Sequence, residues 1–202
     1  MQHPAQAHEA WLSCWRRSAF FVHLRTCLGL INARSLSNNA ELITSYIIDL
    51  GLDFLGMTET WLNSENGDGI IKSVCPDGYS ALLLPRPNRR GVGLELIHKT
   101  SIEVRRPARP PPLIQPTSFE CIDLSLVFRT RRVRFLLVYR LPSSSTACFD
   151  EFSSILEVIS VTSDRLHIVG DFNFHGESES NSAEYPSLQF NHKVEGKLYI
   201  FK

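Results

Sequence analysis

The sequence predicts an α/β fold, because apolar strand patterns alternate with amphipathic helix patterns along the chain. A strand–helix–strand unit covers residues 24–57, several strands follow from residue 79, and a second helix leads into a buried strand over residues 166–169. Helices that connect strands in this way give parallel strand pairs with helices packed on the sheet faces. The length of 202 residues, with 43% apolar and 21% charged residues, suits one globular domain with a sizeable core.

Charge and cysteine content predict the environment more than the function. The formal net charge is zero, so whole-chain charge gives no support for nucleic-acid binding, although a local basic stripe is compatible with neutrality. The five cysteines are scattered, odd in number and never in a Cys-x-x-Cys pair, which indicates free thiols without a disulfide partner or a zinc site. We therefore expect an intracellular protein of the nucleus or cytoplasm that is not secreted.

The first 23 residues are an uninformative N-terminal extension. They lack the basic start and the small-residue cleavage site of a signal peptide. The apolar stretch over residues 19–31 is interrupted by His23 and Arg25 and is too short to cross a bilayer. We expect no membrane interaction.

The first predicted unit runs from a strand to a helix. The strand covers Leu24–Ile31 and ends at Asn32. Asn38 and Glu41 have the spacing of a capping box, which predicts a helix that Gly51 ends. Its apolar positions recur at helical spacing: Leu42, Ile43, Tyr46, Ile47 and Leu50.

Strand patterns dominate the middle of the chain. A strand over residues 53–57 leads to Glu59, and further candidates cover Tyr79–Leu84 and Val92–His98. The proline-rich segment over residues 105–112 predicts an extended loop, with a ligand for a proline-reading module as the alternative.

A long hairpin and a helix complete the predicted fold. Clean alternation over residues 121–128 predicts a strand with one apolar face, and Val133–Tyr139 is its expected antiparallel partner. The arginines of the turn between them predict a solvated hairpin tip, with phosphate contacts as the alternative. A helix follows, with Phe149, Phe152, Leu156 and Ile159 on one face.

The last predicted strand ends in a pair of polar side chains. Leu166, Ile168 and Val169 form a short apolar run before Gly170, and Asp171 and Asn173 follow two residues apart. Their side chains are expected on the same side of the sheet, where they suit a water molecule or a phosphate oxygen. The alternative is an Asx turn that only closes the strand.

Four motifs stand in order at the predicted strand ends: Leu30-Ile31-Asn32-Ala33-Arg34-Ser35-Leu36, Met57-Thr58-Glu59-Thr60-Trp61-Leu62, Val138-Tyr139-Arg140-Leu141-Pro142 and Gly170-Asp171-Phe172-Asn173-Phe174-His175. Together they resemble the endonuclease/exonuclease/phosphatase superfamily, and most closely the endonuclease domains of LINE-type non-LTR retrotransposons. Four motifs in order are more specific than any one of them. The resemblance implies a four-layered α/β sandwich of two packed mixed sheets, with the site at one edge.

The resemblance also implies Mg²⁺-dependent (or Mn²⁺-dependent) cleavage of phosphodiester bonds in DNA. Glu59 is then the metal ligand and Asn32 orients it, Asp171 positions or deprotonates the attacking water, Asn173 holds a phosphate oxygen and Tyr139 donates a hydrogen bond to the phosphate. Taken singly, each residue also has an ordinary structural reading: Glu59 as an exposed acid, Asn32 as a turn residue and Tyr139 as a half-buried aromatic of a strand. The joint pattern favours the site.

Two further residues receive supporting roles. His175 leaves the same strand end as Asp171, and Arg34 stands where apurinic endonucleases of the superfamily have a second acid. We assign both to the shell around the site. Glu95 departs from the resemblance, because it places a charge where an apolar residue is expected.

The C-terminal part departs most from the family pattern. The family supplies an Asp-His pair well after the Gly-Asp-x-Asn motif, whereas here His192 is preceded by Asn191. We therefore divide the chain into the extension 1–23, a partial domain 24–177 that is incomplete at its C-terminal end, and a divergent tail 178–202. The truncation predicts impaired catalysis and an open sheet edge.

Two other functions stay open. One is a non-enzymatic remnant that binds nucleic acid through its arginines: Arg89, Arg90, Arg129, Arg131, Arg132 and Arg134. The other is a calcineurin-like metallophosphatase, suggested by Gly170-Asp171 followed by His175-Gly176. It ranks low, because the sequence has neither the upstream Asp-x-His nor the later Gly-Asn-His of that class.

Overall fold

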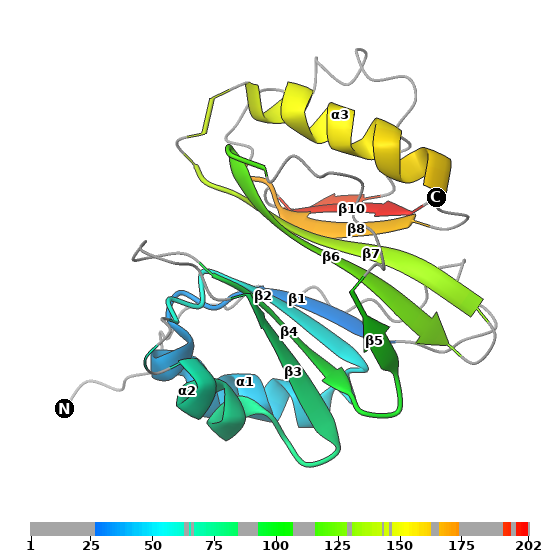
Figure 1. Ribbon diagram of the computed structural model, residues 1–202. Helices are drawn as coiled ribbons and strands as arrows, with labels where there is room; N and C mark the ends of the chain where they lie inside the picture. Colours follow the sequence, from blue (N-terminus) through cyan, green and yellow to red (C-terminus); the bar gives the residue numbers. More distant parts are fainter. Residues whose placement is uncertain are drawn as a thin grey trace.

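Two mixed β-sheets are stacked face to face, and helices cover both outer faces (Figure 1). The computed structural model describes residues 27–62, 65, 67–84, 93–106, 116–128, 131–142, 144–145, 147–162, 166–173, 192–194 and 197–201. The layers run helix, sheet, sheet, helix, which confirms the predicted four-layered α/β sandwich.

The first sheet has four strands in the order β1-β2-β4-β3. Its strands are β1 (Leu28–Asn32), β2 (Phe54–Thr58), β3 (Tyr79–Leu84) and β4 (Leu94–Lys99). The pair β1 and β2 is parallel, and the other two pairs are antiparallel. Helices α1 (Leu36–Asp49) and α2 (Gly67–Val74) cover the outer face of this sheet.

The second sheet has six strands in the order β5-β6-β7-β8-β10-β9. Its strands are β5 (Glu103–Arg105), β6 (Phe119–Phe128), β7 (Arg131–Arg140), β8 (Leu166–Asp171), β9 (His192–Val194) and β10 (Lys197–Phe201). Strands β7 and β8 are parallel, and β6 and β7 form the predicted antiparallel hairpin. Helix α3 (Ala147–Thr162) covers the outer face.

Helix α1 begins earlier than its capping box predicts. Its N-cap is Ser35, not Asn38, and Asn39 interrupts the first turn with φ −120° and ψ 15°. The Asn39 amide donates to the carbonyls of Ala33 and Ser35 at 2.9 and 3.2 Å, so it bonds to the preceding loop. Asn38 therefore does not cap the helix. Gly51 follows the helix with φ 59°, as predicted for its end.

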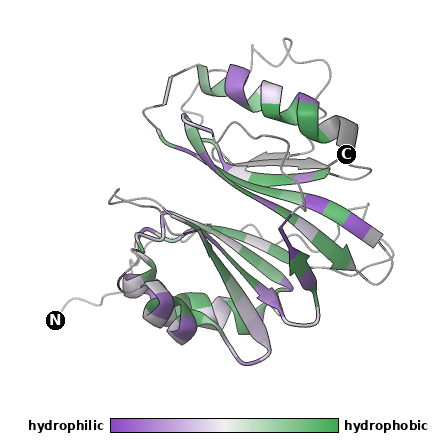
Figure 2. Cartoon of the chain, in the orientation of Figure 1, coloured by the Kyte–Doolittle hydropathy of each residue, from purple (hydrophilic) through white to green (hydrophobic). Residues whose placement is uncertain are grey.

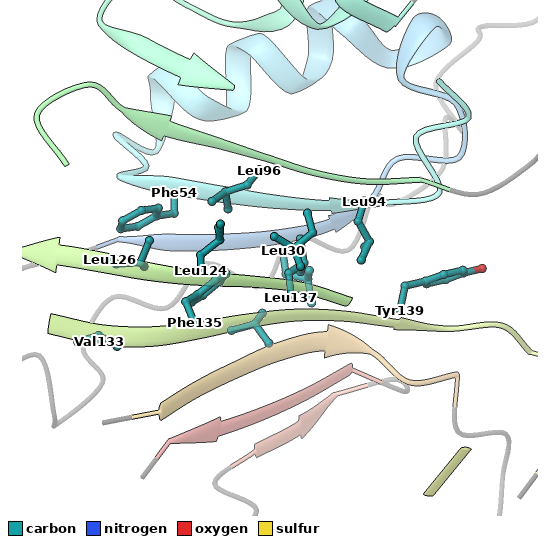
Figure 3. Packing of buried hydrophobic residues seen from close by; sticks show 12 residues of the cluster. Leu30, Phe54, Leu94, Leu96, Leu124, Leu126, Val133, Phe135, Leu137 and Tyr139 are labelled. Carbon is teal, nitrogen blue, oxygen red and sulfur yellow. The ribbon is translucent and has the colours of Figure 1, made fainter. Parts of the chain in front are cut away.

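The two sheets share an apolar core. Leu30, Leu96 and Leu137 are at most 1% exposed, and Figure 3 shows these side chains between the strands of the two sheets. A Cβ atom on Gly56 would lie 3.0 Å from Leu137 Cδ1, so β2 and β7 approach closely at a position without a side chain. Close packing of this kind fixes the relative position of the sheets.

Each outer face of the sheets has its own apolar layer. Ile43, Ile47 and Val74 of the helices are fully buried beside Met57 and Ile97 of the first sheet. On the other side, α3 packs on β7 and β8 through residues that include Phe152, Ile155 and Ile159. Figure 2 shows the matching pattern, with hydrophobic colour along the strands and hydrophilic segments on the helix surfaces.

The tail contributes strands to the second sheet. Strand β10 pairs antiparallel with β8, with Lys197 in register with Asp171, and β9 pairs with β10. Strand β8 is therefore not an edge strand of the second sheet. The domain boundaries at residues 23 and 177 stay predictions, and the proline-rich segment over 107–112 lies outside the described residues.

Among the described cysteines, Cys27, Cys75, Cys121 and Cys148 form no disulfide bond. Within the described ranges, no helix has both the length and the apolar character that a bilayer crossing needs.

Glu95 is a carboxyl group in an apolar layer. It is 2% exposed and lies in register between Met57 of β2 and Leu83 of β3. Burial, together with the nearby Glu120 charge and against the opposing hydrogen bond of the Thr60 hydroxyl, raises its pKa to about 7. The protein therefore holds an acid that changes its charge near neutral pH.

The wild-type chain should lose stability as the pH rises from about 4.5 to about 8, and we predict that Glu95→Gln does not show this loss. In the unfolded chain the carboxyl ionises near its ordinary pKa of 4.5, whereas the folded chain holds it neutral until about pH 7. Stability is therefore complete below the unfolded pKa and falls as pH rises, by about 3 kcal/mol. Urea unfolding of both proteins at pH 5 and pH 8 measures the difference. An equal pH dependence in the variant would contradict the assignment.

Candidate active site

Four strand ends meet at one edge of the stacked sheets. Strands β1 and β2 are parallel and end in Asn32 and Thr58, just before Glu59, while β7 and β8 are parallel with Tyr139 in register with Asp171. The carboxyl ends of two parallel pairs, one in each sheet, therefore lie together. In Figure 3, Tyr139 stands at the end of the row of inter-sheet side chains.

Glu59 is the centre of this cluster. Its Oε1 accepts a hydrogen bond from the Asn32 amide at 2.8 Å and another from the Tyr139 hydroxyl at 2.8 Å. Among the described residues, no hydrogen bond reaches its second oxygen, Oε2. Two donors thus fix the direction of the carboxylate and leave one oxygen for a ligand.

Asp171 joins the cluster through Asn32. The Asn32 amide nitrogen lies 3.4 Å from Asp171 Oδ2, so one amide group bridges two carboxylates that come from different sheets. Asp171 is 6% exposed. Its Oδ1 accepts from the backbone N–H of Asn173 at 3.2 Å, which is the Asx-turn bond that the sequence offers as the alternative reading. The Asx turn and the cluster occur together.

Asn173 bonds to the neighbouring strand β7. Its side-chain amide donates to the backbone carbonyl of Arg140 at 2.6 Å, which ties the end of β8 to the end of β7. The role of Asn173 in holding a phosphate oxygen stays a prediction.

The supporting residues are placed only in part. The backbone N–H of Arg34 donates to Asn32 Oδ1 at 3.2 Å, so the loop after β1 orients the Asn32 side chain. His175 lies outside the described residues. The role of each in the shell around the site stays a prediction.

The loops at this edge have unusual backbone conformations. Within the described ranges, the non-glycine residues with positive φ are Arg34 (40°), Ser35 (85°), Glu59 (53°), Trp61 (56°) and Asn173 (46°). Each such residue costs about 1–3 kcal/mol and persists only where its surroundings hold it, and strain of this kind gathers at functional sites.

Backbone hydrogen bonds between the loops hold this strained geometry. The N–H groups of Ser35 and Leu36 donate to the carbonyls of Glu59 and Thr60 at 3.0 and 2.9 Å. A Cβ atom on Gly93 would come within 2.4 Å of the Thr60 hydroxyl oxygen, so only glycine fits beside this loop. The position of Glu59 is therefore set by its neighbours.

Tyr139 is suited to donate a hydrogen bond rather than to ionise. It is 3% exposed, and burial raises the pKa of its phenol. The hydrogen bond to Glu59 and the negative charges of Glu59 and Asp171 raise the pKa further. The hydroxyl therefore keeps its proton at any physiological pH.

The cluster fits a hard divalent cation by the chemistry of its donors. Mg²⁺ is bound by one or two carboxylates, together with water and phosphate oxygens. Glu59 offers a carboxylate oxygen, and Asp171 lies near it through Asn32. Across the described part of the chain, no group of three or more His, Cys, Asp or Glu side chains gathers as a closed metal site.

Arg140 is a residue to which the sequence gives no role. It follows Tyr139 in the third motif, and its guanidinium donates to the backbone carbonyls of Phe172 and Asn173 at 3.3 Å each. The sequence contains no signal for this contact, because bonds from a side chain to a distant backbone leave no pattern of spacing.

Arg134 is not free to contact phosphate in the way that the nucleic-acid-binding alternative needs. It is 9% exposed, and its Nε and Nη2 lie 2.9 and 2.5 Å from the Asp123 carboxylate. Arg132 is exposed. Arg89, Arg90 and Arg129 lie outside the described residues.

Comparisons with known proteins identify the fold. The sequence matches no family model, and no curated protein matches it. The structure is similar to the catalytic domain of human nocturnin with bound sulfate, at 13% identity and a TM-score of 0.57, over 84% of this chain and 79% of that one.

Two further structures share the fold. The endonuclease domain of TRAS1, a telomere-specific non-LTR retrotransposon, has 10% identity and a TM-score of 0.51, over 74% of this chain and 59% of that one. An endonuclease/exonuclease/phosphatase family protein from Bacteroides thetaiotaomicron has 11% identity and a TM-score of 0.51, over 70% and 56%. The chain thus spans less than two thirds of the length of either. It has the fold of the endonuclease/exonuclease/phosphatase superfamily, as its four motifs predict.

Proposed function

We propose that this chain is a Mg²⁺-dependent phosphodiesterase domain that nicks DNA and derives from a retrotransposon. The observation that supports it most is the hydrogen-bonded cluster of Asn32, Glu59, Tyr139 and Asp171, built from four segments that are remote in sequence. A carboxylate held by two donors, beside a second buried carboxylate, has no evident structural purpose at a sheet edge and suits metal-assisted hydrolysis.

Each residue has a defined task in this proposal. Glu59 holds the divalent cation, which when bound polarises the phosphate and neutralises developing charge. Asn32 keeps Glu59 and Asp171 in their relative positions. Asp171 orients the attacking water and takes its proton, and Asn173 donates to the charged phosphate oxygens, whereas Tyr139 uses its one O–H on Glu59 and so supports the metal ligand.

DNA is the substrate that the similar structures favour. The TRAS1 domain is an endonuclease of a retrotransposon, and a 3′ phosphatase of the same fold from Neisseria is bound to a product DNA hairpin. The fold also serves a mannosyl-6-phosphatase, so small phosphate esters are the matching control substrate. The LINE-type motifs support the retrotransposon origin.

We propose further that turnover is slow. Among the described histidines, His98 is in register with Phe54 at the start of β2, His167 lies near the start of β8, and His192 lies in β9 at the far edge of the second sheet, so none of the three is at the strand ends of the site. Loss of one preorganised donor to a developing oxyanion costs about 10²–10³ in rate. A weak nuclease is therefore the expected result.

The first prediction concerns Glu59. The full chain is expected to nick supercoiled plasmid in the presence of Mg²⁺, and Glu59→Ala is expected to abolish nicking, because it removes the carboxylate that holds the cation. Glu103→Ala is the matched control, since it removes an exposed carboxylate of the surface pair with Arg105. Salt-sensitive DNA binding without cleavage in the wild-type chain would instead support the binding remnant.

The second prediction concerns the hydrogen bond from Tyr139 to Glu59. Tyr139→Phe keeps the ring in the core but removes one of the two donors to Oε1. Loss of such an outer partner of a metal ligand typically costs about 10–100-fold in metal affinity or activity. A Mg²⁺ titration of the nicking rate should show a higher half-saturating concentration. An unchanged titration curve would show that the hydroxyl does not act through Glu59.

A further inference from the structure

Arg140 lies on the side of β7 opposite to Tyr139. Neighbouring residues of a strand point to opposite faces of a sheet. Tyr139 belongs to the core between the sheets, and Arg140 lies toward α3, with its guanidinium carbon 5.4 Å from the centre of the Phe149 ring. Adjacent residues at the end of β7 thus serve the two faces of the same sheet.

The Arg140 guanidinium connects three segments. Nη1 donates to the carbonyls of Phe172 and Asn173 at 3.3 Å each, and Nη2 donates to the Ser144 carbonyl at 2.6 Å. In return, the Arg140 carbonyl accepts from the Asn173 side-chain amide at 2.6 Å. The exit of β8 is therefore bonded to Arg140 in both directions.

Arg140 Nη1 and Nη2 donate their hydrogen bonds to backbone carbonyl groups. Within the described ranges, no carboxylate forms an ion pair with it, and its buried Nε has no hydrogen-bond partner. A half-buried cation without a counter-charge is costly to keep, and the aromatic face of Phe149 offsets only part of that cost. Because this burial of Arg140 costs stability, we look for its purpose in the site and not in the stability of the fold.

We propose that Arg140 is a positioning residue, whose guanidinium fixes the Phe172 and Asn173 carbonyls and thereby holds Asp171 and Asn173 at the site. The proposal rests on the proposed function. Asn173 has a φ of 46°, its backbone carbonyl accepts from Arg140, and its backbone N–H donates to Asp171 Oδ1. Arg140 touches neither carboxylate of the cluster in the described contacts, so it acts through the backbone.

The planar fork of arginine is what the geometry needs. Arginine presents five donors in a fixed plane, whereas lysine offers a point charge on a flexible stem. Arg140→Lys therefore keeps the charge and loses the fork. A misplacement of about 1 Å at a catalytic group can cost about 10²-fold in rate.

The kinetic test compares Arg140→Lys and Arg140→Ala with the wild-type full chain. We expect kcat for plasmid nicking to fall about 10²-fold in Arg140→Lys with KM for DNA unchanged. The double variant Arg140→Lys with Asn173→Ala should be no slower than Asn173→Ala alone, because both changes act on one unit. Additive losses, or a raised KM with unchanged kcat, would overturn the proposal.

A second measurement is independent of activity. Hydrogen exchange of the Asn173 backbone amide reports how firmly the Asp171 turn is held. We expect exchange at least about 10-fold faster in Arg140→Lys and unchanged in Arg105→Ala, a matched surface arginine. If Arg140→Ala does not fold, Arg140→Lys alone decides. Wild-type exchange in Arg140→Lys would refute positioning, whereas an inactive wild-type chain with accelerated exchange would refute only the nuclease function.

Discussion

The stacking of the two sheets is the constraint on which the site depends. Gly56 and Leu137 set the close approach of β2 to β7, and the parallel pairs in the two sheets then end side by side. For this reason Asn32 reaches Asp171, although 139 positions separate them in sequence. Any change that shifts one sheet over the other disturbs the cluster, even where it leaves each sheet intact.

Unfavourable features gather at the same edge. The strained residues, the buried acid Glu95 and the half-buried cation Arg140 all lie in or beside the strand exits. Each costs stability that the apolar layers must offset. Selection for stability alone would not keep these features. Their occurrence at one edge of the sheets agrees with a preorganised site for a charged ligand.

The sequence predicts the strands and the cluster because both depend on simple patterns. Apolar runs end in polar residues, and the alternation along residues 121–128 reproduces β6. The strained loops escape prediction, because Glu59, Trp61 and Arg34 are not residues that favour positive φ. The start of α1 is mispredicted, since Asn39 bonds to the preceding loop and Asn38 does not cap the helix. The contacts of Arg140 with the end of β8 have no sequence pattern that could predict them.

The pairing of β10 with β8 has a consequence for how such a domain tolerates change. The ladder between Lys197–Phe201 and His167–Asp171 joins main-chain groups, which every residue except proline carries. A flanking segment of different sequence can thus complete the sheet beside β8. Exchange of the segment that carries β10 for another of suitable strand pattern therefore need not dismantle the second sheet.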